Sequence, residues 1–331
     1  MSIQRKLALG AAAIAMSLAA YSAKAEELKL AHFASTKYPL HVELMTPLSE
    51  QIAEKSGGDL TIRIYPGGEL GAGPAKQYDR AVDGVADITL ALPGYTASQF
   101  KKTLLVELPG VVPAGKDVTA TFWDNIDEVS KEFRRTKLLA LWSNPPGVLM
   151  TANKPIRSLE DVKGLKIRVP SKNVGRVAAA WGATPVSMPI TEVYNSLATG
   201  VIDGVLVDAS VLNSFKLKEV ANHVTTGMNS TNSPMMLVMN RDSWKDLGEE
   251  KQAVLEGLAG ATLSEAGRKT QAAGAERALK AFSDMGKEII ELSPEEAAKF
   301  NAATDALIEE VVAELESDGV DAGAYVNALR Q

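Results

Sequence analysis

The sequence lacks cysteine and holds only three histidines among its 331 residues. Without cysteine the chain can form no disulfide, and a zinc or iron–sulfur site loses its preferred ligands. The HExxH, GxSxG and GxxxxGK[ST] motifs of metalloproteases, serine hydrolases and P-loop proteins are also missing. Most of the carboxylates lie in helix caps or on charged helix faces, where we expect them to be exposed to solvent and not to take part in catalysis. These absences favour a binding protein over an enzyme, with no metal and no cofactor.

Long apolar runs are missing except at the N-terminus. Arg5 and Lys6 precede a run of apolar or small residues, Leu7 to Ala20, and Ala23-Lys24-Ala25 supplies a small-x-small cleavage site. A transmembrane helix would need about 20 apolar residues. We therefore predict that residues 1–25 are a secretory signal peptide. Because no cysteine is present to carry a lipid anchor, we expect a freely diffusing periplasmic protein.

The chain lacks an excess of positive charge, because 41 Asp and Glu outnumber 35 Lys and Arg. The net charge is −6, and it becomes −9 once residues 1–25, with three basic residues and no acid, are removed. Such a surface disfavours nucleic acid and anionic membranes as partners. An anionic ligand would therefore need a local concentration of positive charge.

Strand and helix signals alternate from Leu28 to about Asn240, which is the pattern of an α/β protein. LTIRIYP (60–66) is echoed by LKIRVP (165–170), and DGVADITLAL (83–92) is echoed by TGVIDGVLVD (199–208). Both members of the second pair carry an aspartate, Asp87 and Asp203, early in an apolar strand, and we expect a structural role for both. Two similar lobes are predicted, and a cleft between lobes is a common ligand site. The alternative is two independent Rossmann-like domains without a shared site.

The second half contains a long stretch of helix formers. From about Glu249 to Phe282, some 34 residues would make a helix about 50 Å long, enough to run across both lobes. Four glycines in this stretch favour a break into two helices. GKEIIELS (286–293) predicts a returning strand, and Ser293-Pro294-Glu295-Glu296 predicts a capped last helix that ends near Ser317.

Arg168 stands near the end of the apolar strand GLKIRVP, residues 164–170. Side chains alternate along a strand, so Lys166 and Arg168 share one face and the apolar residues the other. Arg168 therefore either faces water or lies at the carboxyl end of the strand, where α/β proteins bind ligands.

Longer segments resemble one family. KPIRSLEDVKGLKIRVP (154–170) and WGATPVSMPITEVYNSLATGVIDG (181–204) resemble the DctP-type solute-binding proteins of TRAP (tripartite ATP-independent periplasmic) transporters. EKSGGDLTIRIYPGGELG (54–71) and VMNRDSWKDL (238–247) are similar to the same family, so the resemblance covers nearly the whole mature chain. It implies an α/β fold of two lobes joined by crossing strands and a long helix that spans both lobes. It also implies a receptor without catalysis, which holds a ligand in the cleft and passes it to a membrane permease driven by an ion gradient.

On this resemblance we expect lobe I to comprise residues 26–146 plus about 234–270. Lobe II is expected to comprise residues 147–233 plus about 271–331. The expected partners are a small organic acid and the permease subunits, with no nucleic acid, and the protein is expected to be a monomer.

The resemblance assigns Arg168 to the carboxylate of the ligand. A guanidinium matches a carboxylate bidentately, and the pair would interact by ~4 kcal/mol at an effective dielectric of ~20. Two departures from the family lie nearby. A second arginine that many members carry about twenty residues earlier is Val148 here, and the polar QEN that often follows DG is Val205-Leu206-Val207. We therefore expect a site less polar than a sugar-acid site.

The predicted ligand is a monocarboxylate with an apolar or aromatic body. The aromatic candidates fit core packing as well as ligand contact, and Asp208 either accepts a hydrogen bond from a ligand hydroxyl or amine or is a turn residue. The full predicted set is Arg168, Phe33, Leu92, Tyr95, Trp142, Asn144, Val148, Val207, Asp208 and Tyr38. The alternatives are a receptor for C4-dicarboxylates or other organic anions, a receptor for an ATP-driven importer or a sensor, and a secreted α/β enzyme.

Overall fold

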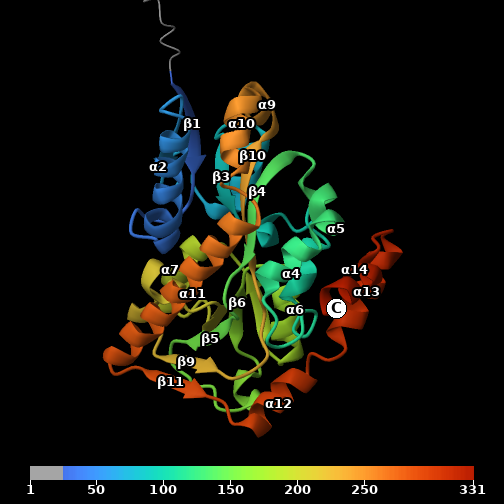
Figure 1. The fold of residues 1–331 in the computed structure, drawn as a ribbon. Coiled ribbons are helices and arrows are strands. Elements are labelled where there is room, and N and C mark those ends of the chain that lie inside the picture. The colour runs from blue at the N-terminus through green and yellow to red at the C-terminus, as the bar shows by residue number, and fades with distance from the viewer. Residues whose placement is uncertain (1–24) are drawn as a thin grey trace, which may run out of the picture.

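A computed structural model describes residues 25–331, so the predicted signal peptide lies outside the described residues except for Ala25. Two β-sheets, one above the other in Figure 1, carry helices on their faces. Within residues 25–331, every helix is too short or too polar to cross a membrane.

The first sheet has five strands in the order β2-β1-β3-β10-β4. β1 pairs in parallel with β2 and β3, whereas β10 runs antiparallel to β3 and β4. The strands are β1 (Glu26–Ala31), β2 (Leu60–Tyr65), β3 (Ile88–Ala91), β4 (Thr136–Ser143) and β10 (Pro234–Asn240). The chain therefore leaves this sheet after β4 and returns to its interior with β10.

The second sheet has six strands in the order β11-β9-β5-β8-β6-β7. β6 lies between β8 and β7 and is parallel to both, and β5 is antiparallel to β8 and β9. The strands are β5 (Val148–Thr151), β6 (Lys166–Val169), β7 (Thr184–Ser187), β8 (Gly204–Val207), β9 (His223–Thr226) and β11 (Glu288–Glu291). β11 confirms the returning strand expected in residues 286–293, and it pairs in parallel with β9.

Helices connect these strands. They are η1 (Leu40–Met45), α2 (Thr46–Lys55), α3 (Gln77–Val82), α4 (Val118–Asp124), α5 (Ile126–Ser130), α6 (Lys172–Ala180), α7 (Ile190–Ala198), α8 (Val211–Ser214), α9 (Arg241–Asp246), α10 (Gly248–Glu256), α11 (Ala261–Asp284), α12 (Pro294–Ala302), α13 (Leu307–Ser317) and α14 (Ala322–Arg330). Two short 3₁₀ turns, η3 (Pro93–Thr96) and η4 (Thr103–Glu107), also bear on the site.

The long helix-forming stretch is split in two, as its glycines favour. Gly260 separates α10 from α11 and has a φ of 76°, a left-handed conformation that glycine adopts without steric cost. α11 has 24 residues, which corresponds to a length of about 36 Å. It packs on β4 and α4 beside the first sheet and on α8 and β11 beside the second (Figure 1). The lobe boundary expected near residue 270 falls inside this shared helix and stays a prediction.

The predicted last helix is wrong in its extent. Its start is as expected, because the Ser293 hydroxyl accepts a hydrogen bond from the backbone N–H of Glu296 at 3.3 Å. However, α12 ends at Ala302, and two further helices follow. The Thr304 hydroxyl donates to the carbonyl of Asn301 at 2.8 Å, a local bond that competes with continued helix.

Asp87 and Asp203 stand directly before β3 and β8, and each makes the same kind of hydrogen bond within its own sheet. The Asp87 carboxylate accepts from the backbone N–H of Lys29 in β1 at 2.8 Å. The Asp203 carboxylate accepts from the backbone N–H of Lys166 in β6, also at 2.8 Å. Each aspartate ties its strand to the neighbouring parallel strand, which confirms the structural role expected for both.

Candidate functional site

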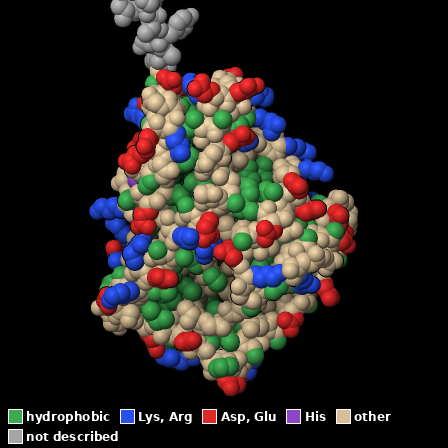
Figure 2. Space-filling model, viewed as in Figure 1, with side chains coloured by type: hydrophobic (Ala, Val, Ile, Leu, Met, Phe, Trp, Pro, Cys, Tyr) green, Lys and Arg blue, Asp and Glu red, His purple; other side chains and the backbone are tan. Residues whose placement is uncertain are grey.

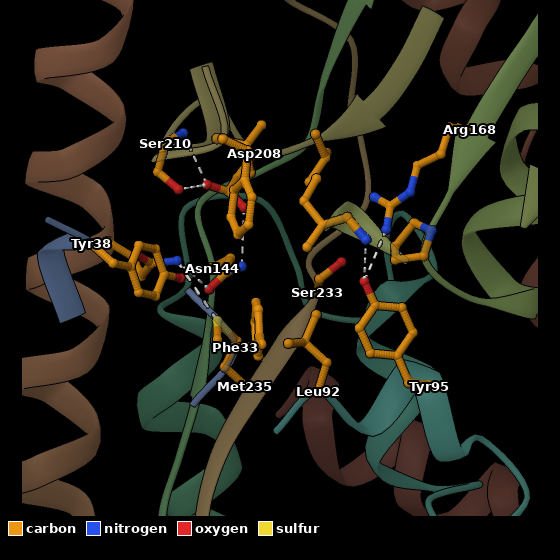
Figure 3. A pocket seen from close by; sticks show the side chains of 16 residues that line it. Phe33, Tyr38, Leu92, Tyr95, Asn144, Arg168, Asp208, Ser210, Ser233 and Met235 are labelled. Atoms are coloured by element: carbon orange, nitrogen blue, oxygen red, sulfur yellow. Dashed lines mark hydrogen bonds between the residues drawn. The ribbon is translucent and has the colours of Figure 1, made fainter. Parts of the chain in front are cut away.

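A cavity lies where the carboxyl ends of strands from both sheets meet (Figure 3). β1 and β3 of the first sheet and β6 and β8 of the second all end at its walls. With its mouth it contains about 410 Å³ of space not filled by atoms.

Eight of the ten predicted residues line this cavity. The first sheet and its loops contribute Phe33, Tyr38, Leu92, Tyr95 and Asn144. The second contributes Arg168, Val207 and Asp208. The side chains thus come from segments that are far apart in sequence.

The other two predicted residues, Trp142 and Val148, are not on the cavity wall. Trp142 is fully buried, and a Cβ built on Gly267 of α11 would lie 2.8 Å from its ring. Trp142 of β4 therefore packs against α11. For this aromatic residue the structure shows core packing, one of the two roles that the sequence left open. Val148 begins β5, pairs with Val207 of β8 and is buried in the core.

Eight further lining residues were not predicted. They are Pro170, Ile190, Ser210, Val211, Phe215, Ser233, Met235 and Gln271. Pro170 and Ser210 each stand within two residues of a predicted one, so a wider window around Arg168 and Asp208 would have included them. Gln271 lies in the middle of α11, where a helical pattern alone does not reveal which face meets a cavity.

Arg168 supplies the positive end of the cavity. It is only 1 % exposed, and burial lowers its pKa while Tyr95 and Asp208 act in the opposite direction. Its Nε donates to the carbonyl of Met188 at 2.9 Å, and its Nη2 donates to the Tyr95 hydroxyl at 3.0 Å. Nη1 has no hydrogen bond to the described residues, and Arg168 has no carboxylate within 4.0 Å in residues 25–331. A buried cation without a close counter-charge is costly unless an anion joins it.

Tyr95 extends this donor group. Its oxygen accepts from Arg168 and also from the backbone N–H of Ile190 at 3.1 Å. Since both lone pairs of the phenol are then used, its own O–H remains free to donate. Arg168 Nη1 and the Tyr95 O–H are therefore two donors available to one anionic group. Tyr95 lies in η3, after β3 of the first sheet, and Arg168 lies in β6 of the second sheet.

Asp208 lies at the opposite side of the cavity from Arg168 (Figure 3). One carboxylate oxygen accepts from the backbone N–H and the hydroxyl of Ser210, and the other accepts from the Asn144 amide at 3.0 Å. Burial raises the pKa of Asp208, and these hydrogen bonds oppose that rise. Asn144 in turn accepts from the Gln271 amide at 3.2 Å.

Apolar groups separate these two polar ends. Phe33 stacks on Phe215 with ring centroids 6.3 Å apart, and Tyr38 meets the same ring edge-on at 6.3 Å. Leu92 lies between the polar ends in Figure 3, and Met235 lines the cavity with its sulfur 3.7 Å from the amide nitrogen of Gln271. The cavity therefore suits a ligand with an anionic end and an apolar body.

Of the residues that the structure describes, Arg168 is the only lysine or arginine on the wall of this cavity. Among residues 25–331, three or more His, Cys, Asp or Glu side chains nowhere gather in a way that could hold a metal ion. His32 and His41 bond to each other at 2.9 Å, and burial lowers the pKa of His32 to about 3. Figure 2 shows acidic and basic side chains interspersed over one face of the molecule. Positive charge for an anion thus comes from one buried arginine.

The family model of bacterial extracellular solute-binding proteins, family 7 (DctP), matches residues 30–315. The chain belongs to this family. It is thus a TRAP-type periplasmic solute-binding protein, which is not an enzyme, and the predicted family and two-lobed fold are confirmed.

Solved structures and curated relatives agree on the fold and differ in ligand. A TRAP solute-binding protein from Rhodoferax ferrireducens in complex with co-purified benzoate is 27% identical, with a TM-score of 0.87 and coverage of 92% of this chain and 96% of that one. A marine metagenome protein specific for aromatic acids, in complex with 3-hydroxybenzoate, is 28% identical with a TM-score of 0.87, covering 92% and 97%. The ectoine-binding protein TeaA of Halomonas elongata is 28% identical over 261 residues, or 76% of this chain and 74% of that protein.

Proposed function

We propose that this DctP-family receptor captures a monocarboxylate with an apolar or aromatic body and delivers it to a TRAP permease. The single observation that carries the proposal is the buried Arg168, which has no acidic partner within 4.0 Å among residues 25–331 and lies at one end of a mostly apolar cavity. In the proposed complex the ligand carboxylate takes donors from Arg168 and Tyr95. At an effective dielectric of ~20 such an ion pair contributes ~4 kcal/mol before desolvation is counted.

Two further facts support the apolar part of the proposal. The position where many family members carry a second arginine is the buried Val148 of β5, so it adds no positive charge to the cavity. Two structures similar to this chain hold benzoate and 3-hydroxybenzoate. TeaA, at comparable identity, is named for ectoine, so identity alone does not select the ligand and the residues of the cavity must.

Ligand capture is expected to favour the closed arrangement of the lobes. The carboxylate would touch Tyr95 from the first sheet and Arg168 from the second, so it stabilises the state in which both are close. η3 and the start of α6 already lie in contact, because a Cβ on Gly94 would be 3.0 Å from the Ser171 Cβ. The permease would then recognise this closed shape. Export through a signal peptide over residues 1–25, and action as a monomer, complete the proposal.

A C4-dicarboxylate is the less favoured ligand. A second carboxylate needs a second cluster of donors, but the end of the cavity opposite Arg168 presents the carboxylate of Asp208. Two carboxylates at close range repel each other, and their pKa values rise.

The test is a thermal-shift screen of the purified protein, preceded by native mass spectrometry for a co-purified acid. Ligands that bind only the folded state raise the apparent melting temperature. Benzoate, phenylacetate and branched monocarboxylates should raise it more than succinate, malate or galacturonate, and uncharged benzamide should have no effect. A larger shift with the C4-dicarboxylates would overturn the proposed ligand class.

A further inference from the structure

The polar end opposite Arg168 is a chain of hydrogen bonds with a fixed direction. The oxygen of Asp208 accepts, so Asn144 must present its NH₂ group to it. The carbonyl oxygen of Asn144 then faces Gln271, which must present its own NH₂ group, at 3.2 Å. Amide orientation follows from such networks. The Gln271 carbonyl oxygen is therefore the free end of the chain.

This free end is buried without a partner. Gln271 is 1 % exposed and lines the cavity, and its Oε1 has no hydrogen-bond partner among residues 25–331. Native proteins rarely leave a buried carbonyl oxygen unpaired, and a bound group is one way to satisfy it.

Asp208 has a free acceptor position as well. A carboxylate offers about four acceptor positions, and the bonds from Ser210 and Asn144 fill three of them. The oxygen bonded to Asn144 keeps one position open. Asp208 and Gln271 both line the cavity, so its second polar end presents acceptors.

We propose that the ligand carries a hydrogen-bond donor, a hydroxyl or amino group, on the end of its apolar body that lies opposite the carboxylate. This donor binds the Asp208 carboxylate and the Gln271 carbonyl oxygen, which makes both residues determinants of specificity. The inference rests on the proposed function, because Arg168 must hold the carboxylate for the other end of the ligand to reach Asp208.

The arrangement selects against three kinds of acid. An acid without a donor leaves both acceptors unpaired, an acid with an ether oxygen there places acceptor against acceptor, and a dicarboxylate places charge against charge. Sites built to bond a ligand hydroxyl can reject the analogue without it by up to ~10⁴-fold. A neutral hydroxyl and a cationic amine share the donor chemistry, but only the cation also offsets the charge of Asp208.

The test compares matched benzoic acids by isothermal titration calorimetry on the purified full-length mature protein. The panel is benzoate, 3- and 4-hydroxybenzoate, 3-methoxybenzoate and 3-(aminomethyl)benzoate. At least one donor acid should bind about tenfold or more tightly than benzoate, while the methoxy acid should bind no better than benzoate. Preference for a hydroxy acid identifies a neutral donor, and preference for the aminomethyl acid identifies a cationic one.

Variants then assign the preference to the two acceptors. Asp208→Asn and Gln271→Met should each reduce the affinity ratio of the preferred donor acid to benzoate by at least about fivefold, whereas Asp305→Asn, at an exposed position, should leave it unchanged. Near-UV circular dichroism checks that the variants fold. If the wild type binds benzoate or 3-methoxybenzoate as tightly as any donor acid, or if both variants keep the ratio, the inference is wrong although the proposed function stands. If no acid in the panel binds, the proposed ligand class fails and the inference with it.

Discussion

Arg63 in β2 and Arg168 in β6 occupy matching positions in the similar strands LTIRIY and KIRV, but their surroundings are opposite. Arg63 is exposed on the edge strand of the first sheet, where its guanidinium lies 5.0 Å from the centre of the Tyr65 ring. Arg168 is 1 % exposed on an interior strand, and Tyr95 from the other lobe bonds to it. The difference is in what covers each strand end, and the sequence around each arginine does not contain that information.

Asp87 and Asp203 show the complementary case. Each binds the backbone of a neighbouring strand in its own sheet, with the same 2.8 Å distance. The aspartates bond within their own lobe, and this hydrogen bond is present in both lobes. Arg168 bonds to a residue of the other lobe, and Arg63 does not repeat that bond. The ligand site depends on contacts of this second kind, between the lobes.

We expect the largest effect when Arg168 is replaced by alanine, and the same substitution at Arg63 is the matched control. Arg168→Ala should weaken binding of the preferred monocarboxylate by about 2–5 kcal/mol, as for other buried charge pairs, because among residues 25–331 no other lysine or arginine lines the cavity. Arg63→Ala should change the affinity by less than about twofold, because Arg63 does not line the cavity and an exposed charge is largely screened. Titration calorimetry with benzoate measures both.

Arg168→Lys separates charge from geometry. A lysine keeps the charge but cannot reproduce the guanidinium fork, so its affinity should fall between those of the wild type and Arg168→Ala. The contrast between the lobes would be lost if Arg168→Ala still bound the ligand with micromolar affinity and Arg63→Ala weakened binding by the same amount as Arg168→Ala.

A smaller effect is expected at Glu107, where the first lobe places a buried carboxyl against the second. The Ser171 hydroxyl at the start of α6 donates to it at 2.6 Å, and burial raises its pKa from 4.5 to about 8. The nearby cations of α6, Lys172 and Arg176, both pair with Glu314. They therefore do not offset the effect of burial on Glu107.

The sign of the pH dependence follows from this raised pKa. Between about pH 4.5 and 8 the folded protein binds a proton at Glu107 that the unfolded chain releases, so stability falls as pH rises. Glu107→Gln should remove this part of the fall and be more stable than wild type at pH 8.5, by an amount on the order of 3 kcal/mol. Urea denaturation at pH 5.5 and 8.5 tests it, with exposed Glu50→Gln as the control. A variant less stable than wild type at pH 8.5 would contradict the prediction.

Local signals were enough for much of the fold. The Ser293 cap, the strand that contains Arg168 and a break within the long helical stretch each depend on a few nearby residues, and each is present in the structure. The early end of α12 was missed because Thr304 is compatible with a helix, and the pattern does not show that its hydroxyl bonds back to Asn301.

The candidate site was predictable only in part, for a reason of geometry. Residues at strand ends, such as Phe33 and Asp208, were found because the α/β fold places strand ends at ligand sites. Trp142 also stands near a strand end, but α11 covers it, with Gly267 allowing the close approach. Gln271 was missed because the rotation of α11 about its axis depends on both lobes at once.

The smallest expected effects concern the hydrogen bonds that Asp87 and Asp203 make within their own sheets. Asp87→Ala removes the bond to Lys29 and a second bond, from the Ser243 hydroxyl at 2.6 Å, whereas Asp203→Ala removes only the bond to Lys166. At about 0.5–1.5 kcal/mol per hydrogen bond, Asp87→Ala should cost ~1–3 kcal/mol and Asp203→Ala ~0.5–1.5 kcal/mol in the free energy of unfolding. Urea denaturation measures both losses, and ligand affinity should stay within about twofold because neither residue reaches the cavity. A larger loss of stability for Asp203→Ala than for Asp87→Ala would mean that the aspartate does not have the same role in the two lobes. The contrast between bonds made within a lobe and bonds made between the lobes would then not explain why only Arg168 is part of the ligand site.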